Sequence, residues 1–500
     1  MAACVATLAA CAPRERRTPD DTLVLVIEAA MNVSDPRFAV SNYDGKLSKL
    51  VHSGLTAADT PTLAPRLELA RRVDRIDPLT WEVELRPDAK FSDGAPVLAA
   101  DVAYTYSSVL DKSSQSLFSR GFAERFESVE AVSDRVVRFH LVEPLATFEL
   151  DIDFGIISKK GLGAGPYVLR ELTTTHALLG TNPHYFGDKP KVPNVEIKFV
   201  KDASARLLML VGGSADLVQN GVRLDLIDEV AARPRVKIDA GRSALLTYMM
   251  LNNADAALGD VRVRQAIALA IDRPALLTAK FSGRAVLASG LVPPGHWAYN
   301  GDVPRWNRDL ARAKQLLDEA GLRDPDGDGP KPRLKLTYKT SADAFRVSIA
   351  RVIAAQLADI GLEVEVRAFE FGTFFADIKK GSYQIASMQT SDISDPDFYF
   401  TYFHSSRIPD AKNPDGGNRW RYKNAEVDRL TFAGRRELDR EKRKAIYDEV
   451  QRIVATEVPI VPLWHEDNVV LTNVDVAGYM ITPNARLGGL RTTTKAVTRR

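Results

Sequence analysis

The 500-residue sequence has almost no cysteine, and its two cysteines, Cys4 and Cys11, both lie near the N-terminus. The rest of the chain can therefore form no disulfide, no thiolate metal site and no cysteine nucleophile. A body without thiols suits an oxidising compartment, where unpaired cysteines would form wrong bonds.

Net charge and long apolar runs are also missing. The 67 Lys and Arg residues nearly cancel the 65 Asp and Glu residues, so no net field attracts nucleic acid or an anionic membrane. No stretch approaches the ~20 consecutive apolar residues that span a bilayer. With 45% hydrophobic and 26% charged residues, the composition is that of a globular protein of two or three domains. We expect a small or locally recognised partner, and no nucleic acid.

The N-terminus begins with small apolar residues that end in Leu-Ala-Ala-Cys at residues 8–11. This resembles a bacterial lipobox, in which the cysteine thiol, here that of Cys11, receives a diacylglycerol anchor. Charged and proline-rich residues follow, as in a flexible tether. We expect a lipoprotein signal and tether over residues 1–21, lipidation at Cys11 and a fold that starts near Thr22. A frayed apolar N-terminus is the alternative.

The body of the chain alternates segments of strand and helix periodicity. The predicted strands cover residues 23–27, 81–85, 136–141, 166–169, 333–338 and 362–368. The predicted helices cover residues 43–55, 99–110, 261–277, 311–320 and 350–360. Such mixing predicts α/β domains.

The most specific motif runs from the strand at residues 81–85, through Lys-Phe-Ser-Asp-Gly-Ala-Pro at residues 90–96, to a helix start. Gly94 supplies the positive φ of the turn, Pro96 stiffens its exit, and Asp101 stands where a helix N-terminus favours a carboxylate. Further motifs are Gly-Ala-Gly-Pro-Tyr at 163–167, Asn-Pro-His-Tyr-Phe-Gly at 182–187, Asp-Val-Arg-Val-Arg-Gln-Ala-Ile at 260–267 and Val-Pro-Ile-Val-Pro-Leu-Trp at 458–464.

Together, in this order, these motifs resemble the family of peptide, dipeptide and nickel-binding solute receptors of ABC transporters. The resemblance implies an α/β, bilobed, periplasmic-binding-protein-like (Venus flytrap) fold with an extra inserted N-terminal domain and lobes that close about a hinge. The expected division is a first lobe at residues 22–47, 164–253 and 465–500, an inserted domain at 48–163 and a second lobe at 254–464. Residues 248–252 and the return strand through Trp464 are the expected hinge strands.

The resemblance also implies how a peptide is held. Residues 391–397 resemble a family loop whose first aspartate, here Asp392, pairs with the ligand α-amino group, and Ser391 precedes it. Asp395 and Asp397 are expected to cap the following segment, a role that is also open to Asp392.

An arginine is expected at the carboxylate end of a peptide because its planar fork matches two oxygens. Arg346, Arg351 and Arg419 are the candidates, and a solvated helix face is the alternative for the first two. Trp420 and Tyr422 are either cleft aromatics or core residues.

Residues next to the first predicted strand are candidate contacts as well. Met31, Asn32 and Val33 follow it, at the edge where open α/β sheets place ligands. His404 follows the aspartate loop and is within possible reach of a ligand. The seven histidines include no close-spaced zinc pair, and no nucleophile motif appears, so we predict no metal, no cofactor and no enzymatic activity.

We therefore predict a monomeric lipoprotein in the periplasm or on the outer face of the cell membrane. It would capture di- or oligopeptides between two lobes and deliver them to ABC permease subunits. Residues 389–391 are Gln-Thr-Ser where many relatives carry Trp or Gly, so a nickel chelate, glutathione or an oligosaccharide remains an alternative ligand. A secreted hydrolase or a sensor domain is the alternative from another class.

Overall fold

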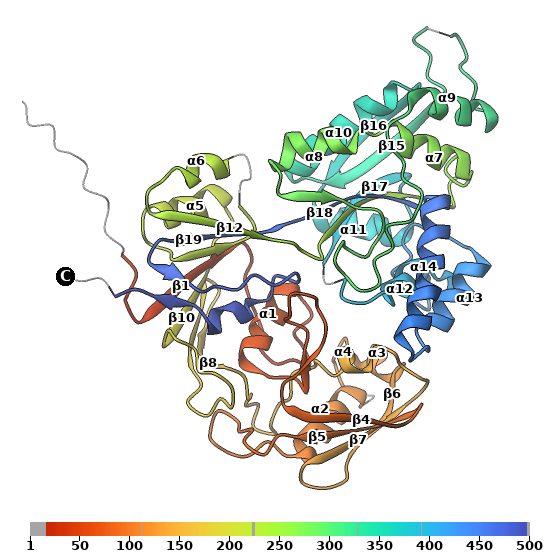
Figure 1. The fold of residues 1–500 in the computed structure, drawn as a ribbon. Coiled ribbons are helices and arrows are strands. Elements are labelled where there is room, and N and C mark those ends of the chain that lie inside the picture. Colours follow the sequence, from red (N-terminus) through yellow and green to blue (C-terminus); the bar gives the residue numbers. More distant parts are fainter. Residues whose placement is uncertain (1–16, 112, 223–225, 328, 392, 498–500) are drawn as a thin grey trace, which may run out of the picture.

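The computed structural model describes residues 17–111, 113–222, 226–327, 329–391 and 393–497. Cys11 and Asp392, the predicted lipidation site and ammonium anchor, lie outside the described residues. Within those residues the strands form a seven-stranded, a six-stranded and a four-stranded sheet and two short two-stranded ribbons (Figure 1). No helix among them is both long and apolar enough to cross a membrane. Helices and strands mix along the chain, which confirms the α/β class.

The first sheet is built around the N-terminal strand. β1 pairs in parallel with β10 and β11, so the carboxyl ends of these strands share one edge. Leu23, Leu25 and Ile27 pack with α1 on one face, and Val26 packs with α5 on the other, as strand alternation requires. In spatial order the strands are β12 (Val236–Gly241), β19 (Asn468–Asn473), β11 (Leu217–Gln219), β1 (Thr22–Ile27), β10 (Asn194–Phe199), β9 (His176–Thr181) and β8 (Tyr167–Leu172). The covering helices are α1 (Asn42–Val51), α5 (Ala203–Val211) and α6 (Ile227–Ala231).

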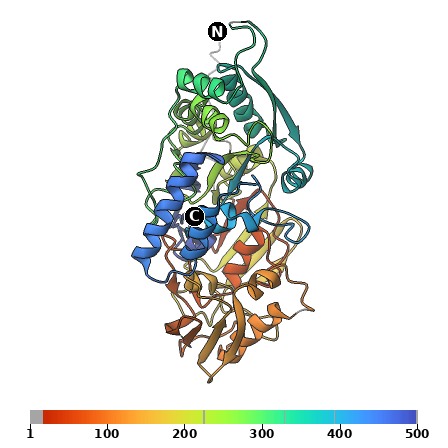
Figure 2. The same ribbon diagram turned by 90° about the vertical axis from the view of Figure 1, so that its right-hand side faces the viewer.

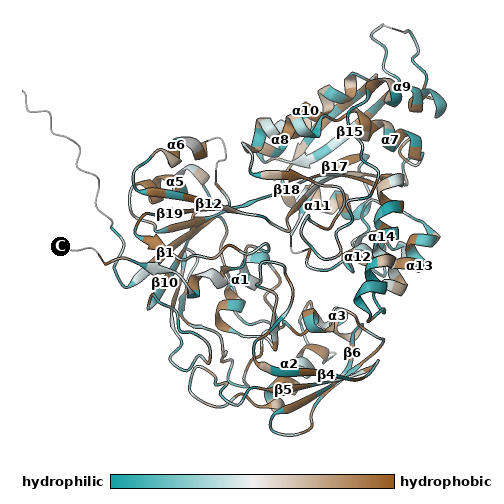
Figure 3. Ribbon diagram, viewed as in Figure 1, coloured by the Kyte–Doolittle hydropathy of each residue, from teal (hydrophilic) through white to brown (hydrophobic). Residues whose placement is uncertain are grey.

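The second sheet is also covered on both faces. Its strands are β14 (Ala285–Leu287), β18 (Ile460–Glu466), β13 (Leu246–Leu251), β17 (Ile385–Thr390), β15 (Leu334–Ser341) and β16 (Leu362–Phe369). One face packs on α7 (Val261–Ala270), α8 (Arg273–Phe281), α9 (Leu310–Glu319) and α10 (Ala344–Ala358). The other packs on α11 (Phe371–Lys380), α12 (Phe398–Phe403), α13 (Ala425–Gly434) and α14 (Arg440–Glu457). In Figure 3 the apolar colour concentrates in the strands of both sheets.

The single helix predicted over residues 261–277 is wrong, because the structure has two helices there. Asp272 accepts a hydrogen bond from the Ala275 amide at 2.9 Å and caps α8. Pro274 follows in the first turn of α8, where its missing N–H costs nothing. This start signal outweighs the continuous apolar spacing. By contrast, the helix predicted over residues 99–110 coincides with α2 (Ala99–Leu110).

The third sheet belongs to a separate body at one end of the molecule (Figure 2). Its strands are β4 (Ala70–Asp77), β5 (Thr80–Leu85), β7 (Val136–Leu141) and β6 (Phe126–Ala131), and α2, α3 (Ser119–Ala123) and α4 (Phe148–Asp151) complete its core. Gly94 has φ +87°, and the Asp101 carboxylate accepts a hydrogen bond from the Leu98 amide at 2.9 Å. The roles predicted for Gly94 and Asp101 are confirmed. The small elements elsewhere are β2 (Thr56–Ala57), β3 (Arg66–Leu67), β20 (Val476–Ala477), β21 (Thr494–Lys495), η2 (Ser405–Arg407) and η3 (Leu487–Arg491).

Two short crossings connect the first and second sheets, as the ribbon in Figure 1 shows. Residues 242–245 lead from β12 to β13, and Asp467 leads from β18 to β19. Arg242 forms an ion pair with Asp467 at 3.0 Å, and the Ser243 hydroxyl donates to the Glu466 carbonyl. The expected hinge strands are β13 and β18, which both lie in the second sheet, so the chain changes sheet just before β13 and just after β18.

Candidate functional site

A cavity of about 1250 Å³ lies between the first and second sheets, next to the crossings. On the first-sheet side it is lined by residues at the carboxyl ends of strands: Ile27, the last residue of β1, and Glu28 after it, and Asn220 and Gly221 after β11. Carboxyl ends of parallel strands are where open α/β sheets bind ligands. The cavity is therefore the candidate ligand site.

On the second-sheet side, the cavity is lined by alternate residues of a strand. Ser387, Gln389 and Ser391 are every second residue along and just beyond β17, so their side chains share a face. Thr247 of β13 and Glu466 of β18 stand beside them on neighbouring strands. These strand residues give the wall a polar strip, and apolar residues such as Phe345, Ile349 and Leu463 line the cavity beside it.

A hydrogen-bond network orders this wall. Arg346, in the first turn of α10, donates from Nη2 to Gln389 Oε1 at 2.5 Å. Gln389 Nε2 then donates to Glu466 Oε1 at 2.5 Å and to Thr247 Oγ1 at 3.0 Å. The amide is thereby held in one orientation, with a guanidinium at its oxygen and a carboxylate at its nitrogen.

The first-sheet wall carries charged side chains, among them Glu28 and Arg206. The Tyr43 hydroxyl donates to Glu28, and burial together with that carboxylate raises the pKa of Tyr43. Arg206 donates to the carbonyl oxygens of Val200 at 2.6 Å and Lys201 at 2.9 Å, and burial lowers its pKa against the opposing effect of Glu28. These bonds to backbone oxygens make Arg206 a structural part of the wall.

Of the predicted ligand contacts, Arg346 and Ser391 line the cavity. Met31, Asn32 and Val33 are not among the described residues that line it. Met31 is buried, and the amides of Asn32 and Val33 donate to the Asp44 carboxylate at 2.6 and 3.1 Å. Asp44 in α1 thus binds the backbone of residues 32–33. The residues at the carboxyl end of β1 that line the cavity are Ile27 and Glu28 instead.

Four further candidates also lie away from the cavity wall that the described residues form. Trp420 and Tyr422 are 0% and 2% exposed and belong to the core of the second sheet, which was their alternative role. The Arg419 guanidinium stacks on the ring of Phe375 at 4.9 Å. His404 accepts a hydrogen bond from the Ser406 amide at 3.1 Å and caps η2.

Residues 393–397 are fixed by Asp395, which sequence reasoning expected to cap the following segment. Asp395 accepts two hydrogen bonds from the Arg443 guanidinium of α14, at 2.8 and 2.5 Å, in a buried ion pair. It also accepts the Asp397 amide at 2.8 Å. The capping prediction for Asp397 is wrong: its side chain makes no capping bond and instead accepts from the Tyr447 hydroxyl at 3.2 Å. Burial raises the pKa of Asp397 to about 6.

Sequence reasoning missed Glu28 and Glu466. Glu28 directly follows the first strand, a signal that was available in the sequence. Glu466 comes two residues after Trp464, but a register shift where β18 pairs with β13 decides its neighbours, and spacing alone does not reveal this.

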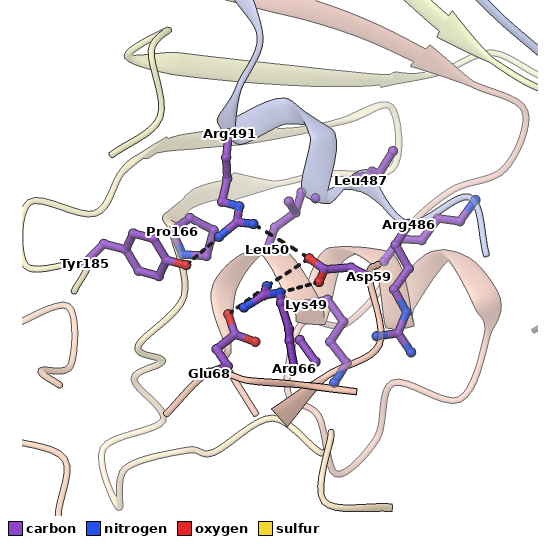
Figure 4. Close-up of a pocket in the computed structure, with 13 residues that line it drawn as sticks. Lys49, Leu50, Asp59, Arg66, Glu68, Pro166, Tyr185, Arg486, Leu487 and Arg491 are labelled. Carbon is purple, nitrogen blue, oxygen red and sulfur yellow. Dashed lines mark hydrogen bonds and ion pairs between the residues drawn. The ribbon is translucent and has the colours of Figure 1, made fainter. Parts of the chain in front are cut away.

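A second, smaller pocket lies where α1, the third-sheet body and the C-terminal segment meet (Figure 4). Asp59 pairs with Arg66 at 2.7 Å. Asp153, which is buried beside the pocket, forms ion pairs with Lys49 at 2.6 Å and with Arg486 at 2.5 Å. These carboxylates already have basic partners. Because Asp153 follows α4 and its partners lie in α1 and the C-terminal segment, the cluster fastens the third-sheet body to the body of the first sheet.

No group of three His, Cys, Asp or Glu side chains in the described part of the chain is arranged to hold a metal ion. The fold and the cavity instead define a class: a two-lobed solute receptor, with paired crossings between two α/β bodies and a ligand-sized cavity between them.

A model of the bacterial extracellular solute-binding proteins, family 5, matches residues 64–410, and the chain belongs to this family. The predicted family and its bilobed fold are confirmed. DdpA of Escherichia coli, described as a probable D,D-dipeptide-binding periplasmic protein, is 26% identical over 93% of this chain and 92% of that protein. The oligopeptide-binding protein AppA of Bacillus subtilis, in complex with a nonapeptide, superposes with a TM-score of 0.80 at 26% identity, over 95% of this chain and 99% of that chain. NikZ of Campylobacter jejuni, in complex with Ni(L-His), shares the fold with a TM-score of 0.83 at 24% identity, over 96% and 100% of the two chains.

Proposed function

We propose that the protein captures di- or oligopeptides between its two lobes, delivers them to the permease of an ABC importer, and does no chemistry itself. The cavity carries this proposal. Its volume of about 1250 Å³ exceeds the about 300–1,000 Å³ of ordinary small-molecule pockets. Its walls offer carboxylates and guanidinium groups to a ligand with two charged ends. The peptide ligands named for DdpA and AppA support the same ligand class.

Arg346 is the proposed anchor of the peptide carboxylate. It lines the cavity, and its bond to Gln389 uses only one of its nitrogens. A guanidinium presents five N–H donors, so donors remain for two carboxylate oxygens. Asp392, next to Ser391 in the sequence, is the proposed ammonium anchor, on the strength of the family resemblance.

The proposed first lobe comprises the seven-stranded sheet with the inserted domain of residues 48–163 attached to it, and the second lobe comprises the six-stranded sheet. Closure would bend residues 242–245 and Asp467 together, because an ion pair and a hydrogen bond tie the two crossings.

The proposed location is the periplasm or the outer face of the membrane, with a monomer anchored through lipid on Cys11. Labelling with a radioactive fatty acid tests the anchor. Wild type is expected to incorporate label and fractionate with membranes, and Cys11→Ala to do neither; a Cys11→Ala variant that is still labelled refutes the site.

Peptide binding is tested by native mass spectrometry of the purified full chain, followed by calorimetry with Ala-Ala, Ala-Ala-Ala and longer alanine peptides. A ladder of co-purifying peptides that disappears in Asp392→Ala is the expected result. Arg346→Met should weaken binding by ~10-fold or more. Arg351→Met is the matched control, because Arg351 is exposed on the same helix and should behave as wild type. A single non-peptide mass that persists in Asp392→Ala would refute the peptide ligand and favour a metal chelate, glutathione or a sugar.

A further inference from the structure

Glu466 occupies an unusual place in the cavity. It is the last residue of β18, the strand that leaves the second sheet for the first, and its partly exposed side chain lines the cavity beside the crossing. A charged ligand group at this position would touch the element about which the lobes are proposed to close.

Neutral donors hold the Glu466 carboxylate, and all of them converge on one oxygen. Oε1 accepts from Gln389 Nε2 at 2.5 Å, Thr247 Oγ1 at 2.8 Å and Trp464 Nε1 at 3.3 Å. Among the described residues, the donors to the Glu466 side chain all contact Oε1 and none contacts Oε2, and no Lys, Arg or His forms an ion pair with Glu466. Because a carboxylate accepts up to about four hydrogen bonds, Oε2 retains capacity for a cationic donor.

The other acidic residues of the cavity are already engaged. Asp467 pairs with Arg242 at 3.0 Å. Asp202 and Asp343 cap α5 and α10 by accepting backbone amides at 2.7 and 3.0 Å. Glu28 accepts the Tyr43 hydroxyl and lies near Arg206. Among the described residues, Glu466 thus differs from Asp467 and Glu28 in having no basic partner. It differs from Asp202 and Asp343 in lying at no helix N-terminus, whose dipole would offset part of its charge.

We propose that Glu466 is a cation subsite that selects peptides with a C-terminal lysine or arginine; this inference rests on the proposed function. Gln389 is the link between Glu466 and Arg346, because its amide contacts both. One amide and two hydrogen bonds separate the Arg346 nitrogen from the Glu466 oxygen by no more than ~8 Å. A ligand residue whose carboxylate pairs with Arg346 thus brings its own long basic side chain within reach of Glu466.

Calorimetry on the full chain with Ala-Ala-Lys and Ala-Ala-norleucine tests the subsite, because the two tripeptides have similar aliphatic stems and only one carries a side-chain charge. Wild type should bind Ala-Ala-Lys ~10- to 100-fold more tightly. Glu466→Gln keeps an oxygen for Thr247 and Gln389, so the wall stays ordered, and the variant should bind the two tripeptides with equal affinity. Glu426→Gln, on the exposed surface of α13, is the control for loss of one negative charge and should keep the preference.

Equal affinity of wild type for the two tripeptides, or a preference that survives in Glu466→Gln, would overturn the subsite while leaving peptide capture intact. If wild type binds neither the alanine peptides nor the two tripeptides, both the proposed function and the subsite are overturned.

Discussion

Removal of the Asp395 carboxylate should destabilise the second lobe strongly. Asp395 and Arg443 are 8% and 5% exposed and share two hydrogen bonds, of 2.8 and 2.5 Å, while Arg443 Nε donates to the Gly434 carbonyl at 2.9 Å. Asp395→Asn would leave a buried guanidinium without its counter-ion. Breaking a buried pair in this way costs about 3–5 kcal/mol, against about 0–1 kcal/mol for a typical surface pair.

Burial is the cause of this cost, and a double variant and a surface pair test it. Asp395→Asn combined with Arg443→Met should recover much of the loss, because replacement of both partners removes the unpaired charge. Glu426 and Arg429 on α13 form a similar two-bond pair, at 2.6 and 2.9 Å, but are 49% and 64% exposed. Arg429→Met should therefore leave the unfolding midpoint unchanged.

Equilibrium urea unfolding followed by tryptophan fluorescence measures these changes. Four of the five tryptophans lie in the proposed second lobe, so the signal reports the lobe that contains the pair: Trp297, Trp306, Trp420 and Trp464. The free energy of unfolding is read from the midpoint and the slope of the transition. A loss below ~1 kcal/mol for Asp395→Asn, or a double variant no more stable than either single one, would refute the reasoning.

Two further predictions concern stability. Burial raises the pKa of Asp397 to about 6, above the ~3.9 of an unfolded aspartate, so the folded state binds more protons between these values and stability falls as pH rises through this window. Asp397→Asn should therefore raise the free energy of unfolding at pH 7 by up to ~3 kcal/mol and have little effect at pH 4. Equal or lower stability than wild type at pH 7 would contradict this. The second prediction is steric: a Cβ on Gly163 would lie 2.1 Å from the Val51 carbonyl oxygen, so Gly163→Ala should lower the free energy of unfolding by ~1–3 kcal/mol. Gly45→Ala in nearby α1 meets no atom within 4 Å and should gain ~0.5–1 kcal/mol; equal urea midpoints for the two variants would refute the steric argument.

Much of the local structure was readable because its causes lie within a few residues. The turn at Gly94 and the helix that starts near Asp101 follow from backbone freedom and capping, and both form as predicted. The single helix predicted over residues 261–277 was wrong for a reason that is equally local. Asp272 and Pro274 signal the start of a new helix, which the continuous apolar spacing obscured.

The candidate site was only partly predictable. Arg346 and Ser391 were identified from the family resemblance, and they do line the cavity. Met31 was expected there because it follows the first strand, but Asp44, in the next helix, captures the adjacent amides and turns the segment away. Trp420 had two possible roles, and burial in the core of the second sheet decided between them.

The sequence by itself determined the alternation of strands and helices, the turn and cap positions, and the family, because each depends on residues close together in the chain. Only the tertiary structure decided which charged groups meet. Asp395 finds Arg443 48 residues away, and Glu466 finds Thr247 219 residues away. Sheet register and helix packing bring such partners together, and these depend on burial of apolar faces along the whole chain rather than on any local pattern.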